Sequence, residues 1–211
     1  MPKRPFDSIG KHRICVICEG LEEYLYFQRL TELGVWSRKY EFNLYNAHGE
    51  ARIFYKYSLV YNDNAYEAVL IFCDTDKAPS VHYRKLKDDI DRFHAKNGIS
   101  DRIVIFANPC SMQLILLHFG EVKLVSQEKK TNAAVIEKLT GVRNYDGHEE
   151  QIRNICSRIF RRSYAEMRER VKVIYFKDTV PSSSNFIVFI EMFESDDSGW
   201  IRRLGNELQR A

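Results

Sequence analysis

Hydrophobic runs alternate with amphipathic stretches through the first half of the chain. Four apolar runs predict buried strands, at residues 12–20, 41–50, 65–77 and 101–110. After each run, apolar residues recur at helical spacing, over residues 21–34, 51–64, 80–98 and 111–120. This alternation predicts an α/β fold, a parallel four-stranded sheet with flanking helices. The near-continuous apolar character of the runs agrees, because parallel strands are buried on both faces.

After Gly120 the pattern becomes mostly helical. Helical spacing covers residues 131–141 and 149–172, a turn follows at 177–186, and the last helical pieces lie at 186–194 and near Trp200. No linker rich in glycine or serine separates the two halves. The sequence therefore predicts an α/β core over residues 1–125 and a mostly helical C-terminal extension over residues 126–211 that packs on it.

Composition places the chain among ordinary globular proteins. Of its 211 residues, 45% are hydrophobic and 29% are charged, and no run of eighteen apolar residues occurs. The first twenty residues lack the apolar segment of a signal peptide, so we expect a cytoplasmic protein without a membrane span. Five cysteines, mostly inside apolar runs, indicate buried thiols. Cys15 and Cys18 would point to opposite faces of a strand, which favours a structural role over a zinc site.

Positive charge is concentrated late in the chain. The formal net charge is only +3, but residues 153–172 hold seven basic residues against two acidic ones. Such a stretch is either a solvated helix face or a surface for nucleic-acid phosphates, with aromatic residues available for base stacking. The candidates for nucleic-acid contact are Arg158, Arg161 and Arg162.

Acidic residues close two of the predicted strands. Glu19 ends the first, and Asp74 and Asp76 end the third, where extended backbone would place the two aspartates roughly 7 Å apart on one side. The carboxyl ends of parallel strands meet at one edge, so these acids would share a crevice and repel one another without a cation. Oxygen ligands of this kind suit Mg²⁺ or Mn²⁺. Glu23, on the first helical turn, either adds a ligand or offsets the helix dipole.

The same residues resemble a known family. The segments "CEGLEEYLYF", "FCDTDK", "NPCSMQLILLHF" and "VPSSSNFIVFIEMF" are similar, in order and spacing, to motifs of RloB-like proteins. These proteins carry a TOPRIM domain and are related to OLD-type nucleases. The resemblance implies a TOPRIM-type, Rossmann-like fold, Mg²⁺-dependent cleavage of nucleic-acid phosphodiesters, and a setting in bacterial defence against phage. One departure is Met112, where family members usually carry a glutamate.

Four further residues have two interpretations each. Lys77 follows Asp76 and either stabilises phosphate charge or is a solvated loop residue. His48, after the second strand, is a candidate for phosphate or base contact. His118 lies in an apolar run, which favours a core histidine over a proton shuttle. Asn108, before Pro109, either caps a helix or orients substrate.

These observations predict a Mg²⁺- or Mn²⁺-dependent nuclease. Glu19, Asp74, Asp76 and Lys77 are its predicted catalytic residues, and Glu19, Glu23, Asp74 and Asp76 its metal ligands. The partner would be DNA or RNA, and homo-oligomers remain open. The chain has no phosphate-binding P-loop, so any ATPase would be supplied by another chain. Two alternatives stay open, a non-catalytic nucleic-acid-binding module and a regulatory subunit of a defence complex.

Overall fold

The computed structural model describes residues 10–76, 80–174 and 177–208. Its central element is a five-stranded sheet in the order β2-β1-β3-β4-β5. The strands are β1 (His12–Cys18), β2 (Tyr40–Asn46), β3 (Ala68–Asp74), β4 (Val104–Asn108) and β5 (Ser183–Ser184). The first four run parallel, whereas β5 is antiparallel to β4. The predicted α/β class and the four parallel strands are confirmed, but the predicted total of four strands is wrong.

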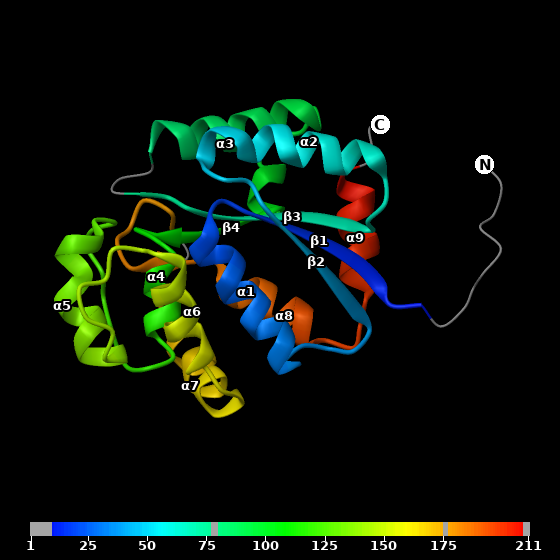
Figure 1. Cartoon of the computed structure of the whole chain (residues 1–211). Coiled ribbons are helices and arrows are strands. Elements are labelled where there is room, and N and C mark those ends of the chain that lie inside the picture. Colours follow the sequence, from blue (N-terminus) through cyan, green and yellow to red (C-terminus); the bar gives the residue numbers. More distant parts are fainter. Residues whose placement is uncertain (1–9, 77–79, 175–176, 209–211) are drawn as a thin grey trace.

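Helices cover both faces of the sheet (Figure 1). On one side lie α2 (Ile53–Asp63) and α3 (Val81–Phe93), and on the other α1 (Leu21–Leu33) and α8 (Phe186–Glu194). The remaining helices are α4 (Met112–Leu116), α5 (Lys129–Thr140), α6 (Glu149–Ser157), α7 (Arg161–Val171) and α9 (Gly199–Leu208). Helices α4 to α7 gather beside α1 in Figure 1. Two short 3₁₀ turns lie at Glu50–Arg52 and Ile99–Arg102.

The C-terminal residues complete the sheet and its core. Asn185 follows β5, and its side-chain amide accepts from Phe106 N at 2.9 Å and donates to Val104 O at 2.7 Å. These two bonds to the backbone of β4 extend the pairing between β5 and β4 by one residue. On α8, Phe186 stacks on Phe72 of β3 with ring centroids 5.8 Å apart. Two serines carry no strand signal by themselves, which is why the sequence predicted only a turn here.

The helix predicted over residues 149–172 is two helices. The chain breaks between α6 and α7, where Ile159 is fully buried and its carbonyl accepts from the Arg29 guanidinium at 2.8 Å. The Ser163 hydroxyl then accepts from Phe160 N at 2.9 Å and begins α7. Because contacts from α1 impose this break, the local sequence gives no glycine or proline signal for it.

Two structural predictions for single residue types are confirmed. All five cysteines are free and buried. His118 lies in the core, where its Nε2 pairs with the Tyr26 hydroxyl at 2.9 Å and burial lowers its pKa to about 3. Within the described ranges, none of the helices has both the length and the apolar character needed to cross a bilayer.

Candidate functional site

Glu19 and Asp74 meet at the carboxyl ends of two adjacent strands. Glu19 follows β1, which pairs directly with β3, and its backbone N donates to Phe72 O at 2.9 Å. Its side-chain Oε2 accepts from Asp74 N at 3.0 Å. The sheet thus places two of the predicted acids, Glu19 and Asp74, in contact through a backbone amide of β3.

Asp74 is fixed from its other side by the start of α4. Its Oδ1 accepts from Ser111 N at 2.7 Å. Among the described residues, Glu19 Oε1 and Asp74 Oδ2 have no hydrogen-bond donor, and both side chains are partly exposed. Each carboxylate therefore has one oxygen held by a backbone amide and one that is free to bind a ligand.

Glu23 has both oxygens engaged. It is 3% exposed, and its Oε2 accepts from Gly20 N at 2.8 Å, which secures the start of α1. Its Oε1 accepts a short hydrogen bond from the Ser111 hydroxyl. Of the two roles expected for Glu23, this geometry favours the one at the helix start.

Asp76 lies outside the strand. β3 ends at Asp74, and Asp76 has φ +55°, with its N donating to Pro109 O at 3.1 Å. The expected placement of the two aspartates on one extended strand is therefore wrong, because the chain turns between them. Burial raises the pKa of Asp76 while His82 lowers it, and the charges of Asp76 and Glu50 contribute to raising the pKa of Glu19. Lys77 lies outside the described residues.

The carboxyl groups at this corner repel one another. Burial, and then the charge of Glu23, raise the pKa of Glu19 to about 8, with smaller contributions from Asp76 and Glu50. The pKa of Asp74 is raised well above its ordinary value by burial and by the charges of Glu23 and Glu19. The amides of Asp74 and Ser111 oppose these shifts in part. Such mutual destabilisation is what a bound cation would relieve.

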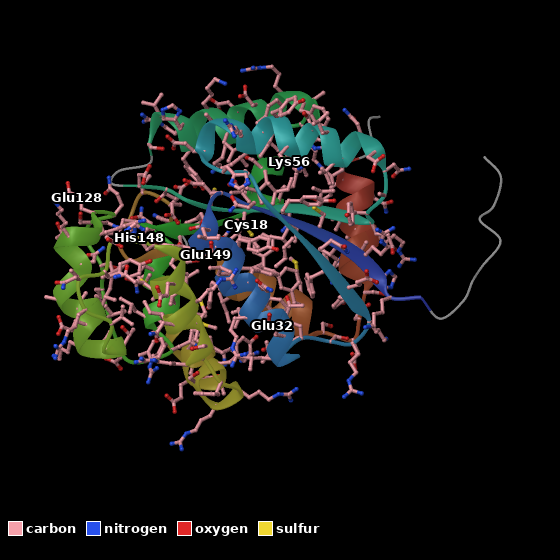
Figure 2. All side chains as sticks on the ribbon, in the orientation of Figure 1. Cys18, Glu32, Lys56, Glu128, His148 and Glu149 are labelled. Carbon is pink, nitrogen blue, oxygen red and sulfur yellow. The ribbon has the colours of Figure 1, made fainter. Side chains whose placement is uncertain are left out.

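A cleft of about 190 Å³ opens over Glu19 and Asp74. Its opposite wall comes from α5, α6 and the chain between them, and includes Lys129, Asn132 and Tyr145. Figure 2 labels Glu128, His148 and Glu149 at the starts of these helices. The cleft is thus enclosed by both halves of the chain.

Lys129 and Tyr145 line the cleft, and both contact the carboxylate of Glu22. The Tyr145 hydroxyl donates to Glu22 Oε1 at 2.7 Å, and Lys129 Nζ lies 3.4 Å from the same oxygen. Gly147 leaves space for the lysine, since a Cβ there would lie 1.8 Å from Nζ. Among the described residues lining the cleft, Lys129 is the one with a basic side chain. The contacts of Glu22 with Tyr145 and Lys129 could not be predicted from the sequence, because they join residues more than one hundred positions apart.

Met112 forms part of the cleft wall but is 2% exposed. It lies in the first turn of α4, directly after Ser111, which binds both Asp74 and Glu23. At this position, where members of the family that the sequence resembles usually have a glutamate, the wall of the cleft is apolar.

Asn108 takes neither of its expected roles. Its Nδ2 donates to Asp178 O at 2.5 Å, so the amide secures the turn before β5. Ser111, rather than Asn108, precedes α4. The expected helix cap at Asn108 is therefore wrong, and its side chain is 2% exposed and does not line the cleft.

The residues expected to contact nucleic acid lie in two places. His48 is exposed at the acidic corner, next to Gly49, whose N donates to Glu19 O at 2.8 Å. By contrast, Arg161 donates to Gly34 O at 3.3 Å, at the far end of α1. A helix of 13 residues is about 20 Å long, so the structure separates this arginine from the acids by that length.

The other two arginines of this set have protein partners as well. The Arg158 guanidinium donates to Thr140 O at the end of α5. Arg162 is 92% exposed and lies 3.4 Å from Glu166 one turn along α7. All three arginines are exposed, but Arg158 and Arg161 also bind helix ends, whereas Arg162 lies beside Glu166 of its own helix.

The acidic corner is not a complete metal cage. Within residues 10–76, 80–174 and 177–208, no three His, Cys, Asp or Glu side chains are grouped closely enough to hold a metal ion by themselves. No family model, curated protein or solved structure matches the chain. The chemistry of the corner must therefore be argued from its own geometry.

Proposed function

We propose that the chain is a Mg²⁺- or Mn²⁺-dependent nuclease of TOPRIM type that cleaves nucleic-acid phosphodiester bonds. One observation carries the proposal. Glu19 Oε2 accepts from the backbone amide of Asp74, each carboxylate has a free oxygen, and burial together with the charges of neighbouring carboxylates raises the pKa of both. Acids arranged in this way at strand ends are typical of cation sites that act on phosphates.

The donor set fits Mg²⁺ even without a third protein ligand. Mg²⁺ usually keeps several waters and is held by one or two carboxylates together with substrate phosphates. Glu19 Oε1 and Asp74 Oδ2 are the two oxygens that would hold it, and Asp76 would add negative charge to this corner. A cage of three side chains is thus not required.

The residues of the cleft have separate roles in this mechanism. A bound Mg²⁺ or Mn²⁺ would supply Lewis-acid activation of the phosphate and of a water molecule. Glu19 and Asp74 would hold this ion, and the backbone amides of Asp74 and Ser111 keep both carboxylates in place. Lys129, positioned by Glu22 and Gly147, offers a positive charge to the phosphate oxygens.

A second candidate is a non-catalytic nucleic-acid-binding module. Two observations favour it: buried Met112 stands where the resembling family has a glutamate, and Glu23 is committed to Gly20 and Ser111. Such a protein could act as a regulatory subunit in a defence complex, with nucleotide hydrolysis supplied by a partner ATPase. The phage-defence setting and the cytoplasmic location belong to this proposal and rest on the resemblance and the sequence.

Cleavage assays with matched variants test the proposal. Duplex DNA, single strands and structured RNA would be incubated with Mg²⁺, with Mn²⁺ or with a chelator. We expect metal-dependent cleavage that falls at least a hundredfold in Glu19→Gln and Asp74→Asn. Glu32→Gln is the control, because Glu32 is an exposed acid near the far end of α1. Cleavage that survives both site substitutions would refute the mechanism.

Metal binding is measured separately from cleavage. Mn²⁺ should raise the melting temperature of the parent and of Glu32→Gln, and should have little effect on Asp74→Asn. If metal and nucleic acid both bind but no substrate is cleaved, the non-catalytic module is the better description. If Mn²⁺ stabilises Asp74→Asn as much as the parent, the acidic corner is not the metal site.

A further inference from the structure

The two edges of the sheet differ in a way that the proposed nuclease does not explain. At one edge, β5 has only two residues. At the other, β2 has seven, and Figure 1 shows no strand on its outer side. Among the described residues, β1 is the sole strand that pairs with β2.

The outer edge of β2 presents unpaired backbone groups. His12 N donates to Lys39 O, and Ala47 N donates to Cys18 O, at the two ends of the β1–β2 ladder. In a parallel ladder, alternate residues of a strand bond to the same neighbour, so the odd-numbered residues of β2 face β1. The N–H and C=O groups of Phe42 and Leu44 therefore point outward.

β2 has little that protects this edge beyond the charge of Glu41. Proteins usually guard exposed edges with proline, lysine, a bulge or a very short strand. The strand reads "YEFNLYN", without proline or lysine, and its register with β1 runs through seven consecutive pairs without a bulge. An edge of this length and regularity is suited to pairing with another strand.

We propose that two copies of this chain pair through β2, antiparallel, with Asn43 on the two-fold axis. Asn43 is the middle residue of Tyr40–Asn46, so this register overlaps the whole strand. It places Phe42 opposite Leu44 of the second copy, as a hydrogen-bonded pair formed by the outward-facing groups. Both side chains are partly exposed in the single chain and would cover each other.

The side chains on the other face of β2 complement themselves across the axis. Asn43 meets the second copy's Asn43, and in the single chain its Nδ2 is buried without a hydrogen-bond partner among the described residues. A turn of the amide about its last side-chain bond would let the two amides pair. The register therefore gives a partner to a group that lacks one.

Charge complementarity selects the same register. Glu41 lies opposite the second copy's Tyr45, and Lys56 of α2 lies over that Tyr45 ring, 4.6 Å from its centroid. Figure 2 labels Lys56. Among the described residues, neither Glu41 nor Lys56 has a salt-bridge partner. The two-fold axis therefore places Glu41 of each copy near Lys56 of the other, which forms two ion pairs. A strand from an unrelated protein would not provide both pairs.

Cysteine cross-linking tests the register. Opposed residues of a non-hydrogen-bonded antiparallel pair have Cα atoms about 4.5 Å apart, which lies within the range that disulfides span. With oxidised glutathione as oxidant, Asn43→Cys should give a covalent dimer in at least half of the chains. The native cysteines are buried and should not react. Asn62→Cys, at an exposed position of α2, and Glu41→Cys as a single substitution are controls that should remain uncross-linked.

Charge reversal tests the pairing without oxidation. In sedimentation velocity the parent should form a dimer, and Glu41→Lys should raise its dissociation constant at least tenfold by opposing two lysines. Adding Lys56→Glu should restore the parent's value. A monomeric parent, or equal cross-linking of Asn43→Cys and Asn62→Cys, would overturn the proposal. Weakening by Glu41→Lys without rescue by the second change would overturn this register.

Discussion

At the scale of single residues, the chemistry depends on two carboxylates that share a strand end. Glu19 and Asp74 could be identified from the sequence because each closes an apolar run, and parallel strands end at one edge. Asp76 could not be placed in this way, because a left-handed residue after β3 turns the chain. The sequence therefore predicts that Glu19 and Asp74 lie at the ends of neighbouring strands, but not the turns that follow.

The pH dependence of stability follows from the raised pKa of Glu19. The folded protein holds its proton to about pH 8, whereas an unfolded glutamate loses it near 4.5. The stabilising contribution is therefore complete below the unfolded value and is lost as the pH rises through 8. In chelator, we expect the melting temperature to fall by several degrees between pH 5 and pH 9.

Two measurements test whether Glu19 causes this loss of stability. Glu19→Gln should flatten the fall, because an amide does not ionise, and added Mg²⁺ should reduce it in the parent at the alkaline end. Glu32→Gln should behave as the parent does, since Glu32 is exposed. Identical pH profiles of the parent and Glu19→Gln would show that Glu19 does not titrate in this range.

Met112 gives a second prediction at this scale. Its side chain is 2% exposed, so Met112→Glu should place a carboxylate next to acids that already repel one another. We expect a loss of several kcal/mol in the free energy of unfolding, measured by urea denaturation. Met112→Leu, which conserves volume, should cost less than about 1.5 kcal/mol. A stable Met112→Glu protein that cleaves faster would show instead that the side chain turns into the cleft.

At the scale of helices and strands, the basic stretch holds helix ends together. Arg158 binds the carbonyl that ends α5, and Arg161 binds the carbonyl of Gly34 after α1. Positive charge at a helix carboxyl end is favourable, so these contacts account for two of the arginines without any ligand. The sequence showed a basic helix face, but not that two of its members reach other helices.

Alanine substitutions separate these structural roles from nucleic-acid binding. Arg158→Ala and Arg161→Ala should each lower the free energy of unfolding by about 0.5–2 kcal/mol, and Arg162→Ala by less than about 0.5 kcal/mol. If Arg162 contacts phosphate, its loss should also reduce the salt dependence of nucleic-acid binding by about one unit. Equal stability losses at all three positions would contradict the assignment of helix-end contacts.

Helix and strand positions were predictable where the signal is local. The four parallel strands and α1 to α3 follow apolar periodicity, and α1 ends at Gly34, which has the left-handed conformation expected of a helix end. The break between α6 and α7 was missed, because Arg29 of α1 binds the carbonyl of Ile159 from a distance in sequence. β5 was missed for a similar reason, since Asn185 and β4 define it together.

At the scale of the whole molecule, the C-terminal residues are part of the sheet's own core. Phe186 and Phe193 of α8 pack on aromatic rings from β3, β2 and α1. In the same way, α5 and α6 supply the second wall of the cleft over Glu19. The boundary predicted at residue 125 thus separates two stretches of sequence that share one core and one candidate site.

This shared core leads to a prediction about fragments. Removing residues 126–211 would expose Phe72, Phe42 and Phe27, which α8 covers. Burial of a phenylalanine contributes about 1.5–3 kcal/mol, so losing three such contacts approaches the whole stability of a typical domain. We expect the fragment 1–125 to show no cooperative urea transition and weak near-ultraviolet circular dichroism. When it is co-expressed with the fragment 126–211, the two should purify as a complex with a single transition. A cooperative transition in the fragment 1–125 alone would show that the α/β core folds without α8.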